Sequence, residues 1–290
     1  MPNKKAQVGK IDKMRVAFQG ERGAYSESAV YAFFGQSVDI KPCRNLSDVF
    51  ESVEKEETEY GVVPIENSIE GSVNQTYDLF LTHNLKVCGE IIHKIDHCLI
   101  ANPNTKLESV KVVYSHPQAL AQCGTFLERL GCDVVPTYDT AGSVKMMKEK
   151  KLKNAGAIAS ERAAEIYEMK ILAKEIADNP NNYTRFFALS KNDSPPTGRD
   201  KTSIIFSVKH VPGSLYHALE EFAKRNISLT KIESRPTKRT PWEYNFYLDF
   251  EGHRQEEKCL EALKELKKRA VFIRILGSYP RASQDFQNQM

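Results

Sequence analysis

The chain has 290 residues, with 41% hydrophobic, 27% charged and 9% aromatic side chains, which is the composition of an ordinary globular protein of about two domains. Its 41 basic and 38 acidic residues leave a net charge of +3, too small an excess to indicate a nucleic-acid-binding surface. No apolar run approaches the roughly 18 residues of a membrane span, and the polar N-terminus lacks the apolar segment of a signal peptide. The 6 cysteines form no CxxC pair, so we expect a reduced, cytoplasmic protein.

Short β-rich segments alternate with amphipathic helical patterns in the first part of the chain, which is typical of an α/β fold. The predicted strands include residues 15–18, 60–64, 110–114 and 155–159. An extended segment over residues 86–101 is long enough to cross between two lobes. We therefore expect residues 14–190 to form two α/β subdomains with a cleft between them.

A linker and a change of order follow this region. Residues 191–200, KNDSPPTGRD, combine prolines, a glycine and charges, as linkers do. Residues 201–280 then read as strand, helix, strand, strand, helix, strand, and this βαββαβ order predicts a ferredoxin-like domain. Because its sheet leaves edges and one face uncovered, we expect it to pair with a second copy.

Ligands of open α/β sheets bind beyond the carboxyl ends of the strands, so the turns at those ends are candidate sites. The turn over residues 19–26, QGERGAYS, has two glycines that let the backbone approach a ligand, and a helix opening at Ser26 whose N-terminus favours an anion. A glycine turn with a serine cap is an equally good interpretation. The turn over residues 64–72, PIENSIEGS, places a carboxylate, an amide and a hydroxyl in succession at Glu66, Asn67 and Ser68.

Two further segments carry polar groups at strand ends. Ser115 and His116 precede a helix that Pro117 starts well, and Gln122 lies on the same face of that helix as Gln118. For Ser115 alone, a helix N-cap explains the residue equally well. The segment NNYTRFF over residues 181–187 brings a hydroxyl and a guanidinium into an aromatic strand, in which adjacent phenylalanines face opposite ways.

No metal or cofactor site is predicted. His93, His97 and Cys98 are spaced along an extended strand, and no second pair completes a tetrahedral zinc site. The sequence has no Walker loop, GxSxG elbow or HExxH motif. A cleft rich in hydroxyls and amides fits either a non-catalytic solute-binding protein or an enzyme whose reaction needs only positioning and one proton.

Six motifs follow one another in the order of one enzyme family, and through them the chain resembles prephenate dehydratases over residues 14–276. They are FQGERGAYSE, GVVPIENSIEGSV, YSHPQALAQC, YDTAGS, NYTRF and, beyond the linker, IESRP. The resemblance implies a two-lobed catalytic domain similar to type 2 periplasmic binding proteins and an ACT regulatory domain. With so few residues ahead of Met14, we expect the monofunctional form without a chorismate mutase domain.

The activity implied by the resemblance is the conversion of prephenate to phenylpyruvate in phenylalanine biosynthesis, with feedback inhibition by L-phenylalanine. Thr184 is then expected to donate a hydrogen bond to the leaving hydroxyl, with Glu66 as the buried acid and His116 as the second choice. Arg185 and the helix start at Ser26 are expected to bind carboxylates. The groups expected to hold substrate oxygens or to form an apolar wall are Asn67, Ser68, Ser115, Gln122 and Phe186.

The effector residues implied by the same resemblance are Gly213, Ser214, Leu215, Ser228, Glu233, Ser234, Arg235 and Pro236. Ser214 and Ser228 depart from the alanine and asparagine usual in the family, so an effector other than L-phenylalanine is the alternative. For Glu233 and Arg235, an ordinary surface ion pair is the alternative. We expect a homodimer or homotetramer. Arogenate dehydratase and a non-catalytic amino-acid-sensing protein are the alternative functions.

Overall fold

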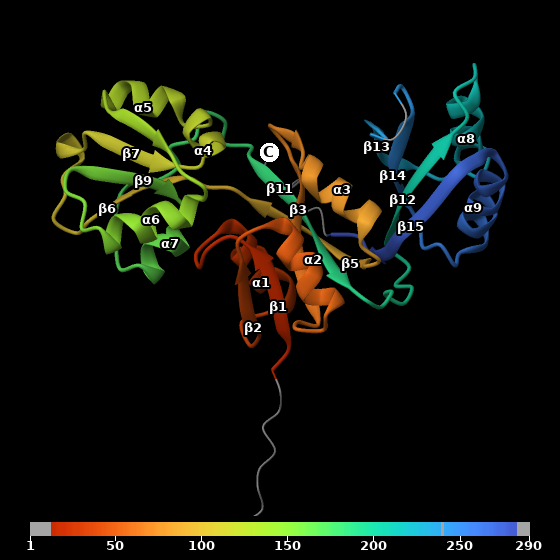
Figure 1. Cartoon of the computed structure of the whole chain (residues 1–290), viewed down its shortest axis with the longest axis horizontal. Helices are drawn as coiled ribbons and strands as arrows, with labels where there is room; N and C mark the ends of the chain where they lie inside the picture. Colours follow the sequence, from red (N-terminus) through yellow and green to blue (C-terminus); the bar gives the residue numbers. More distant parts are fainter. Residues whose placement is uncertain (1–12, 239–240, 283–290) are drawn as a thin grey trace, which may run out of the picture.

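The computed structural model describes residues 13–238 and 241–282, which form two lobes and a C-terminal domain (Figure 1). The first lobe contains β1 (Arg15–Gln19), α1 (Tyr25–Phe34), β2 (Asp39–Cys43), α2 (Leu46–Glu54), β3 (Tyr60–Asn67), β4 (Gly71–Ser72), α3 (Asn74–Thr82), β5 (Lys86–Lys94) and β11 (Tyr183–Ser190). Its sheet has the order β2-β1-β3-β11-β5, with β4 paired to β3. Strand β11 returns late in the sequence and lies antiparallel between β3 and β5.

Two chain segments connect the first lobe to the second lobe. It contains β6 (Cys98–Ala101), a 3₁₀ turn (Leu107–Ser109), β7 (Val112–Ser115), α4 (Pro117–Ala121), α5 (Gly124–Leu130), β8 (Asp133–Pro136), α6 (Thr140–Glu149), β9 (Ala155–Ala159), α7 (Glu161–Ile166) and β10 (Lys170–Ala173), with the sheet order β10-β6-β9-β7-β8. Residues 95–97 lead into this lobe and residues 174–182 lead back. The predicted extended segment is thus two strands joined at the crossing.

The C-terminal domain has the predicted βαββαβ order. Its elements are β12 (Asp200–Val208), α8 (Ser214–Ala223), β13 (Leu229–Pro236), β14 (Tyr244–Glu251), α9 (Glu257–Arg269) and β15 (Ala270–Pro280), in an antiparallel sheet of order β13-β14-β12-β15. Helices α8 and α9 cover one face of this sheet through Phe206, Phe222 and Leu266. No helix within the described ranges is long and apolar enough to cross a membrane.

The other face of this sheet packs against the first lobe, so two domains share one hydrophobic core. Ile205, Tyr247 and Tyr279 of the C-terminal domain lie in one buried cluster with Phe80 and Phe187 of the first lobe. Rings of Tyr279 and Phe187 are 5.5 Å apart. The C-terminal domain is therefore docked on the back of the sheet that carries β3 and β11 (Figure 1).

The two glycines of the 19–26 turn allow the two lobes to approach each other closely. Gly23 has φ +88°, and a Cβ there would lie 2.7 Å from the Cα of Ala163 in α7. Ser160 donates a hydrogen bond to the Gly23 carbonyl at 2.6 Å, which fixes the two lobes at this point. Helix α1 begins at Tyr25 with Ala24 as its N-cap, so Ser26 is not the cap that the sequence interpretation offered.

Candidate active site

A cavity of about 550 Å³ lies between the two lobes and receives side chains from both. Six of the residues predicted from the sequence line it, namely Ser26, Asn67, His116, Gln122, Thr184 and Phe186. The lining also includes residues to which the sequence analysis gave no role, among them Tyr25, Arg44, His97 and Asp139. The cavity is thus the cleft expected from the two-lobed fold.

Strand register decides which residues of β3 and β11 face this cleft. Thr184 pairs with Asn67, and Arg185 pairs with Glu66. Because neighbouring residues of a strand point to opposite faces, the first pair faces the cleft and the second faces the C-terminal domain. The sequence expectation that all four residues share one site therefore does not match their placement.

The amide of Asn67 sets the direction of the hydrogen bond to Thr184. Its Oδ1 accepts the backbone N–H groups of Ile69 and Glu70, both at 3.0 Å, so its Nδ2 must point the other way. Nδ2 donates to Oγ1 of Thr184 at 3.0 Å and to Oδ1 of Asn182 at 2.7 Å. Thr184 accepts in this bond, and its own hydroxyl proton is therefore available to a ligand in the cleft.

Gln122 joins the second lobe to the same polar cluster. Its Oε1 lies 2.8 Å from Nδ2 of Asn182 and 3.0 Å from Nε2 of His97. Its Nε2 donates to Glu70 at 3.3 Å. The carboxamide therefore bridges both lobes beside the cleft.

His116 is the N-cap of α4 and also lines the cleft. Its Nδ1 accepts the backbone N–H of Gln118 at 3.3 Å. Burial lowers the pKa of His116, which favours the neutral ring with its proton on Nε2. The residue is thus suited to donate a neutral hydrogen bond, and the cap that the sequence offered to Ser115 belongs to His116.

Ser115 and Ser68 lie outside the cleft. Ser115 is fully buried, and its Oγ donates to the carbonyl of Ile158 at 2.6 Å in the sheet of the second lobe. Ser68 donates to the carbonyl of Asn181 and accepts the N–H of Tyr183, each at 2.9 Å. Both hydroxyls are satisfied by backbone, so their expected contact with substrate is not supported by their position.

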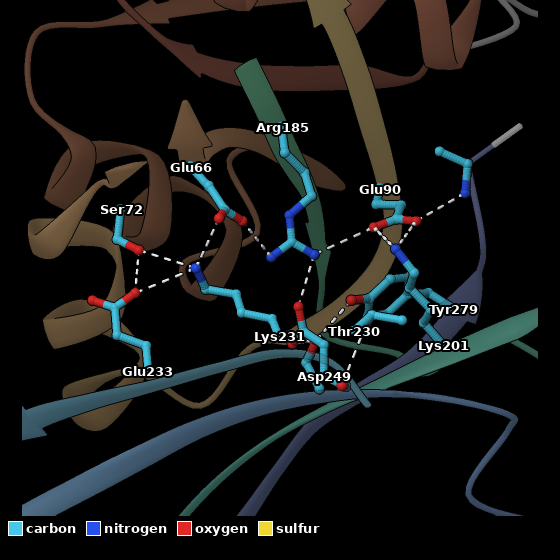
Figure 2. A network of polar contacts seen from close by, with 12 residues as sticks. Glu66, Ser72, Glu90, Arg185, Lys201, Thr230, Lys231, Glu233, Asp249 and Tyr279 are labelled. Atoms are coloured by element: carbon cyan, nitrogen blue, oxygen red, sulfur yellow. Dashed lines mark hydrogen bonds and ion pairs between the residues drawn. The ribbon is translucent and has the colours of Figure 1, made fainter. Parts of the chain in front are cut away.

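Arg185 and Glu66 belong to an ion network between the first lobe and the C-terminal domain, seen from close by in Figure 2. Arg185 contacts Asp249 at 2.7 Å, Glu66 at 3.1 Å and Glu90 at 3.4 Å. Glu66 also contacts Lys231 of β13 at 3.0 Å. Burial by itself would lower the pKa of Arg185, but Asp249 and the other neighbouring groups outweigh it and raise that pKa well above its ordinary value. Arg185 is therefore a structural cation and not a free carboxylate ligand.

Asp139 and Arg44 place a carboxyl group and a cation at the cleft, and the sequence analysis gave neither residue a role. Asp139 is 8% exposed, and burial raises the pKa of its carboxyl. Its Oδ1 accepts the N–H of Gly142 at 2.6 Å as the N-cap of α6. The Asp139 position lies in the quoted YDTAGS motif, which is the signal that could have identified it. Arg44 is exposed beside the cleft and makes no hydrogen bond or ion pair with any described residue.

The residues predicted to bind an effector fall into two groups. Ser214 and Leu215 line a separate cavity of about 350 Å³, together with Val211 and Tyr244. Gly213, with φ +81°, is the N-cap of α8 beside them. Ser228 is exposed, and its carbonyl accepts the N–H of Glu251 at 2.9 Å.

The second group lies on β13 and alternates between two faces. Glu233 faces the first lobe, where it bonds Ser72 and lies 3.3 Å from Lys231. Arg235 also faces the first lobe and contacts Asp78 at 3.1 Å. Ser234 and Pro236 point outward and are exposed. Glu233 and Arg235 are thus neither free effector ligands nor a surface ion pair with each other, because they hold the domain interface.

The described residues contain no group of three or more His, Cys, Asp and Glu side chains arranged to hold a metal ion. All six cysteines are free thiols.

Comparison with known proteins gives matches to both parts of the chain. A family model described as prephenate dehydratase matches residues 16–194, and a model described as ACT domain matches residues 202–268. A bifunctional chorismate mutase/prephenate dehydratase of Aquifex aeolicus (strain VF5) is 47% identical over 273 residues, which is 93% of this chain and 74% of that protein. The chloroplastic arogenate dehydratase/prephenate dehydratase 2 of Arabidopsis thaliana is 45% identical over 284 residues, 94% of this chain and 74% of that protein. The crystal structure of a prephenate dehydratase from Arthrobacter aurescens in complex with L-Phe superposes with a TM-score of 0.86 at 32% identity, covering 93% of this chain and 90% of that one.

Proposed function

Since the chain belongs to the prephenate dehydratase family, as its motifs predicted, we propose that the cleft between its lobes converts prephenate to phenylpyruvate. In this reaction the ring carboxylate leaves as carbon dioxide, and the electrons of that bond enter the ring. The ring C–O bond breaks, and the hydroxyl takes one proton and leaves as water. Aromatisation supplies the driving force, so the protein has to position the substrate, supply one proton and exclude water.

The observation that carries the proposal is the Asn67–Thr184 pair. Because Thr184 accepts from Asn67, its own O–H is left to donate to the ring hydroxyl as that group departs. A threonine hydroxyl is too weak an acid to be the final proton source. Asp139 fits that role, since it lines the same cavity and its pKa is raised by burial.

The remaining cleft residues match the other demands of the reaction. Arg44 has no hydrogen-bond or ion-pair partner among the described residues and is placed to bind a substrate carboxylate. Phe186 is 2% exposed and supplies an apolar wall. Such a wall favours loss of the hydration shell of the ring carboxylate, which leaves as carbon dioxide. Gln122 and His116 add neutral donors on the side of the second lobe.

The C-terminal domain is the regulatory part in this proposal, and L-phenylalanine is its effector. The cavity at Ser214 and Leu215 would hold the amino acid, with a second copy of the domain closing it. Large apolar side chains around it support such pairing, because Val211, Trp242 and Val271 are all highly exposed. We therefore also propose a homodimer or homotetramer, and a cytoplasmic location in keeping with six free thiols.

One assay tests the catalytic part of the proposal. The purified full chain is incubated with prephenate, and phenylpyruvate is followed by its absorbance in alkali. The same protein is then given arogenate, and phenylalanine is measured. Turnover of prephenate with a much smaller kcat/KM for arogenate supports the proposal. Preference for arogenate would show that the chain is an arogenate dehydratase. Binding of either compound without turnover would show that it is a non-catalytic sensor.

A further inference from the structure

A continuous chain of side-chain hydrogen bonds connects residues that line the cleft and ends on a histidine that the mechanism has not used. It passes from Thr184 through Asn67, Asn182 and Gln122 to His97. His97 is 2% exposed and lies in the segment 95–97 that crosses between the lobes. Its other ring nitrogen, Nδ1, is 2.9 Å from the hydroxyl of Tyr25 in α1.

The direction of every hydrogen bond in this chain follows from the orientation of the Asn67 amide. Backbone N–H groups fix Oδ1 of Asn67 as an acceptor, so its Nδ2 donates and Oδ1 of Asn182 accepts. The other end of the Asn182 amide, Nδ2, must then donate to Oε1 of Gln122. An amide oxygen cannot donate, so the contact between Gln122 and His97 requires a proton on Nε2 of the imidazole.

The opposite side of the ring agrees with this assignment. Burial lowers the pKa of His97, which favours a neutral imidazole with a single proton. With that proton on Nε2, Nδ1 is an acceptor for the hydroxyl of Tyr25. Burial also raises the pKa of Tyr25 well above its ordinary value, so the phenol keeps its proton. Tyr25 shares this one proton between His97 and the carbonyl of Asp96, which is 2.8 Å away.

His97 lies where the chain crosses between the lobes, and it connects side chains of both. The backbone of the crossing is tied on both sides, because Ile176 N–H bonds the His97 carbonyl at 3.1 Å and Asp178 N–H bonds the Gln122 carbonyl at 2.8 Å. His97 thus links α1 of the first lobe, through Tyr25, to the C-terminal end of α4 in the second lobe, through the cap residue Gln122. We propose that His97 is a positioning residue whose Nε2–H holds the carboxamide of Gln122, and with it the hydrogen-bond chain to Thr184, in the productive orientation.

Paired variants measure this role, and they rest on the proposed prephenate dehydratase activity. His97→Leu removes the donor, and misplacement of the catalytic groups should lower kcat by about 10²-fold with a smaller change in KM. His97→Gln places an amide N–H near the same point and should restore most of kcat. His83→Leu is the matched control, because His83 is also largely buried and bonds a glutamate at 2.8 Å but lies outside the cleft. Normal kcat in His97→Leu, or equal loss in His97→Gln, would overturn the proposal.

A second measurement needs no substrate, so it separates failure of this inference from failure of the proposed function. Nitrogen-15 NMR of the histidine rings in the folded full chain should show His97 as the neutral Nε2–H tautomer at neutral pH. The Tyr25→Phe variant should show the same tautomer, because Gln122 and not Tyr25 determines it. A proton on Nδ1 alone, or a charged ring at neutral pH, would refute the assignment even if the leucine variant failed to fold.

Discussion

Thr184 is 9% exposed and lines the cleft, and its hydroxyl has one side-chain partner among the described residues, the amide of Asn67, which donates to it. Replacing it with alanine removes a proposed proton donor without opening a large cavity. We predict that Thr184→Ala lowers kcat for prephenate by about 10² to 10⁴-fold, the usual value of a positioned donor, with an unchanged melting temperature. Thr184→Ser keeps the hydroxyl and should be much milder. Near-normal turnover by the alanine variant would contradict the assigned role.

Asp139 leads to a prediction about pH. If its protonated carboxyl is the acid, kcat falls as the pH rises through its raised pKa, because the acid form is lost. Asp139→Asn keeps an oxygen acceptor for the Gly142 N–H, so the helix cap survives and the acid does not. We predict a lower kcat for this variant, and we predict that its kcat does not show this fall as the pH rises. Asp178→Asn is the control, since Asp178 also accepts a backbone N–H but is exposed.

The pH dependence of stability tests the raised pKa of Asp139 independently of activity. A folded-state pKa above the unfolded value gives stability that is present at low pH and is lost as the pH rises through the folded pKa. The wild type should therefore lose stability relative to Asp139→Asn over that range in thermal denaturation. A wild-type kcat that does not fall on the alkaline side would exclude Asp139 as the acid.

Strand alternation explains which site residues could be predicted from the sequence. The rule that adjacent strand residues face opposite ways separates Phe186 in the cleft from Phe187 in the shared core. The same rule applied to Glu66 and Asn67 would have removed Glu66 from the cleft. The motif resemblance grouped all of them, because family motifs record residues of both faces without distinguishing them.

The two faces of β3 and β11 lead to a prediction for Glu66. Its side chain is 35% exposed, and its carboxylate contacts Arg185 of the same sheet and Lys231 across the domain interface. Glu66→Gln should therefore keep kcat in the absence of effector near the wild-type value, while weakening inhibition by L-phenylalanine. Steady-state kinetics with and without the effector test this. A loss of about 10²-fold in kcat would instead support the catalytic role first expected from the sequence.

At the scale of the whole chain, the order of elements was predictable and the docking of domains was not. Periodicity and turn residues predicted the two-lobed α/β region and the βαββαβ domain, both of which the structure confirms. No periodicity indicates that Arg235 meets Asp78, or that Tyr247 and Phe80 share a core. Arg44 was missed for the same reason, because tertiary structure brings its loop to the cleft, whereas the YDTAGS motif did contain a signal for Asp139 on the other lobe.

The docked arrangement makes the proposed regulation measurable as a coupling between two sites. L-phenylalanine bound at the C-terminal domain can act on the cleft only if the two ligands favour different arrangements of the protein, and the interface contacts of Arg185 and Lys231 are the route that we propose. Such coupling is typically about 1–3 kcal/mol, or about 5- to 150-fold in affinity, and it is reciprocal. Thr184→Ala, which should consume prephenate about 10² to 10⁴-fold more slowly than the wild type, allows both directions to be titrated by calorimetry.

We predict that prephenate weakens the binding of L-phenylalanine to Thr184→Ala by the same factor by which L-phenylalanine weakens prephenate. Adding Lys231→Met, which removes the cation between Glu66 and Glu233, should bring this factor toward one while each ligand still binds alone. Sedimentation in the same buffers reports whether the effector changes the oligomer. No heat with L-phenylalanine at millimolar concentrations would show that Ser214 and Ser228 have changed the effector, and tyrosine and tryptophan are then titrated. Full coupling in the Lys231→Met protein would place the connection between the sites outside this network.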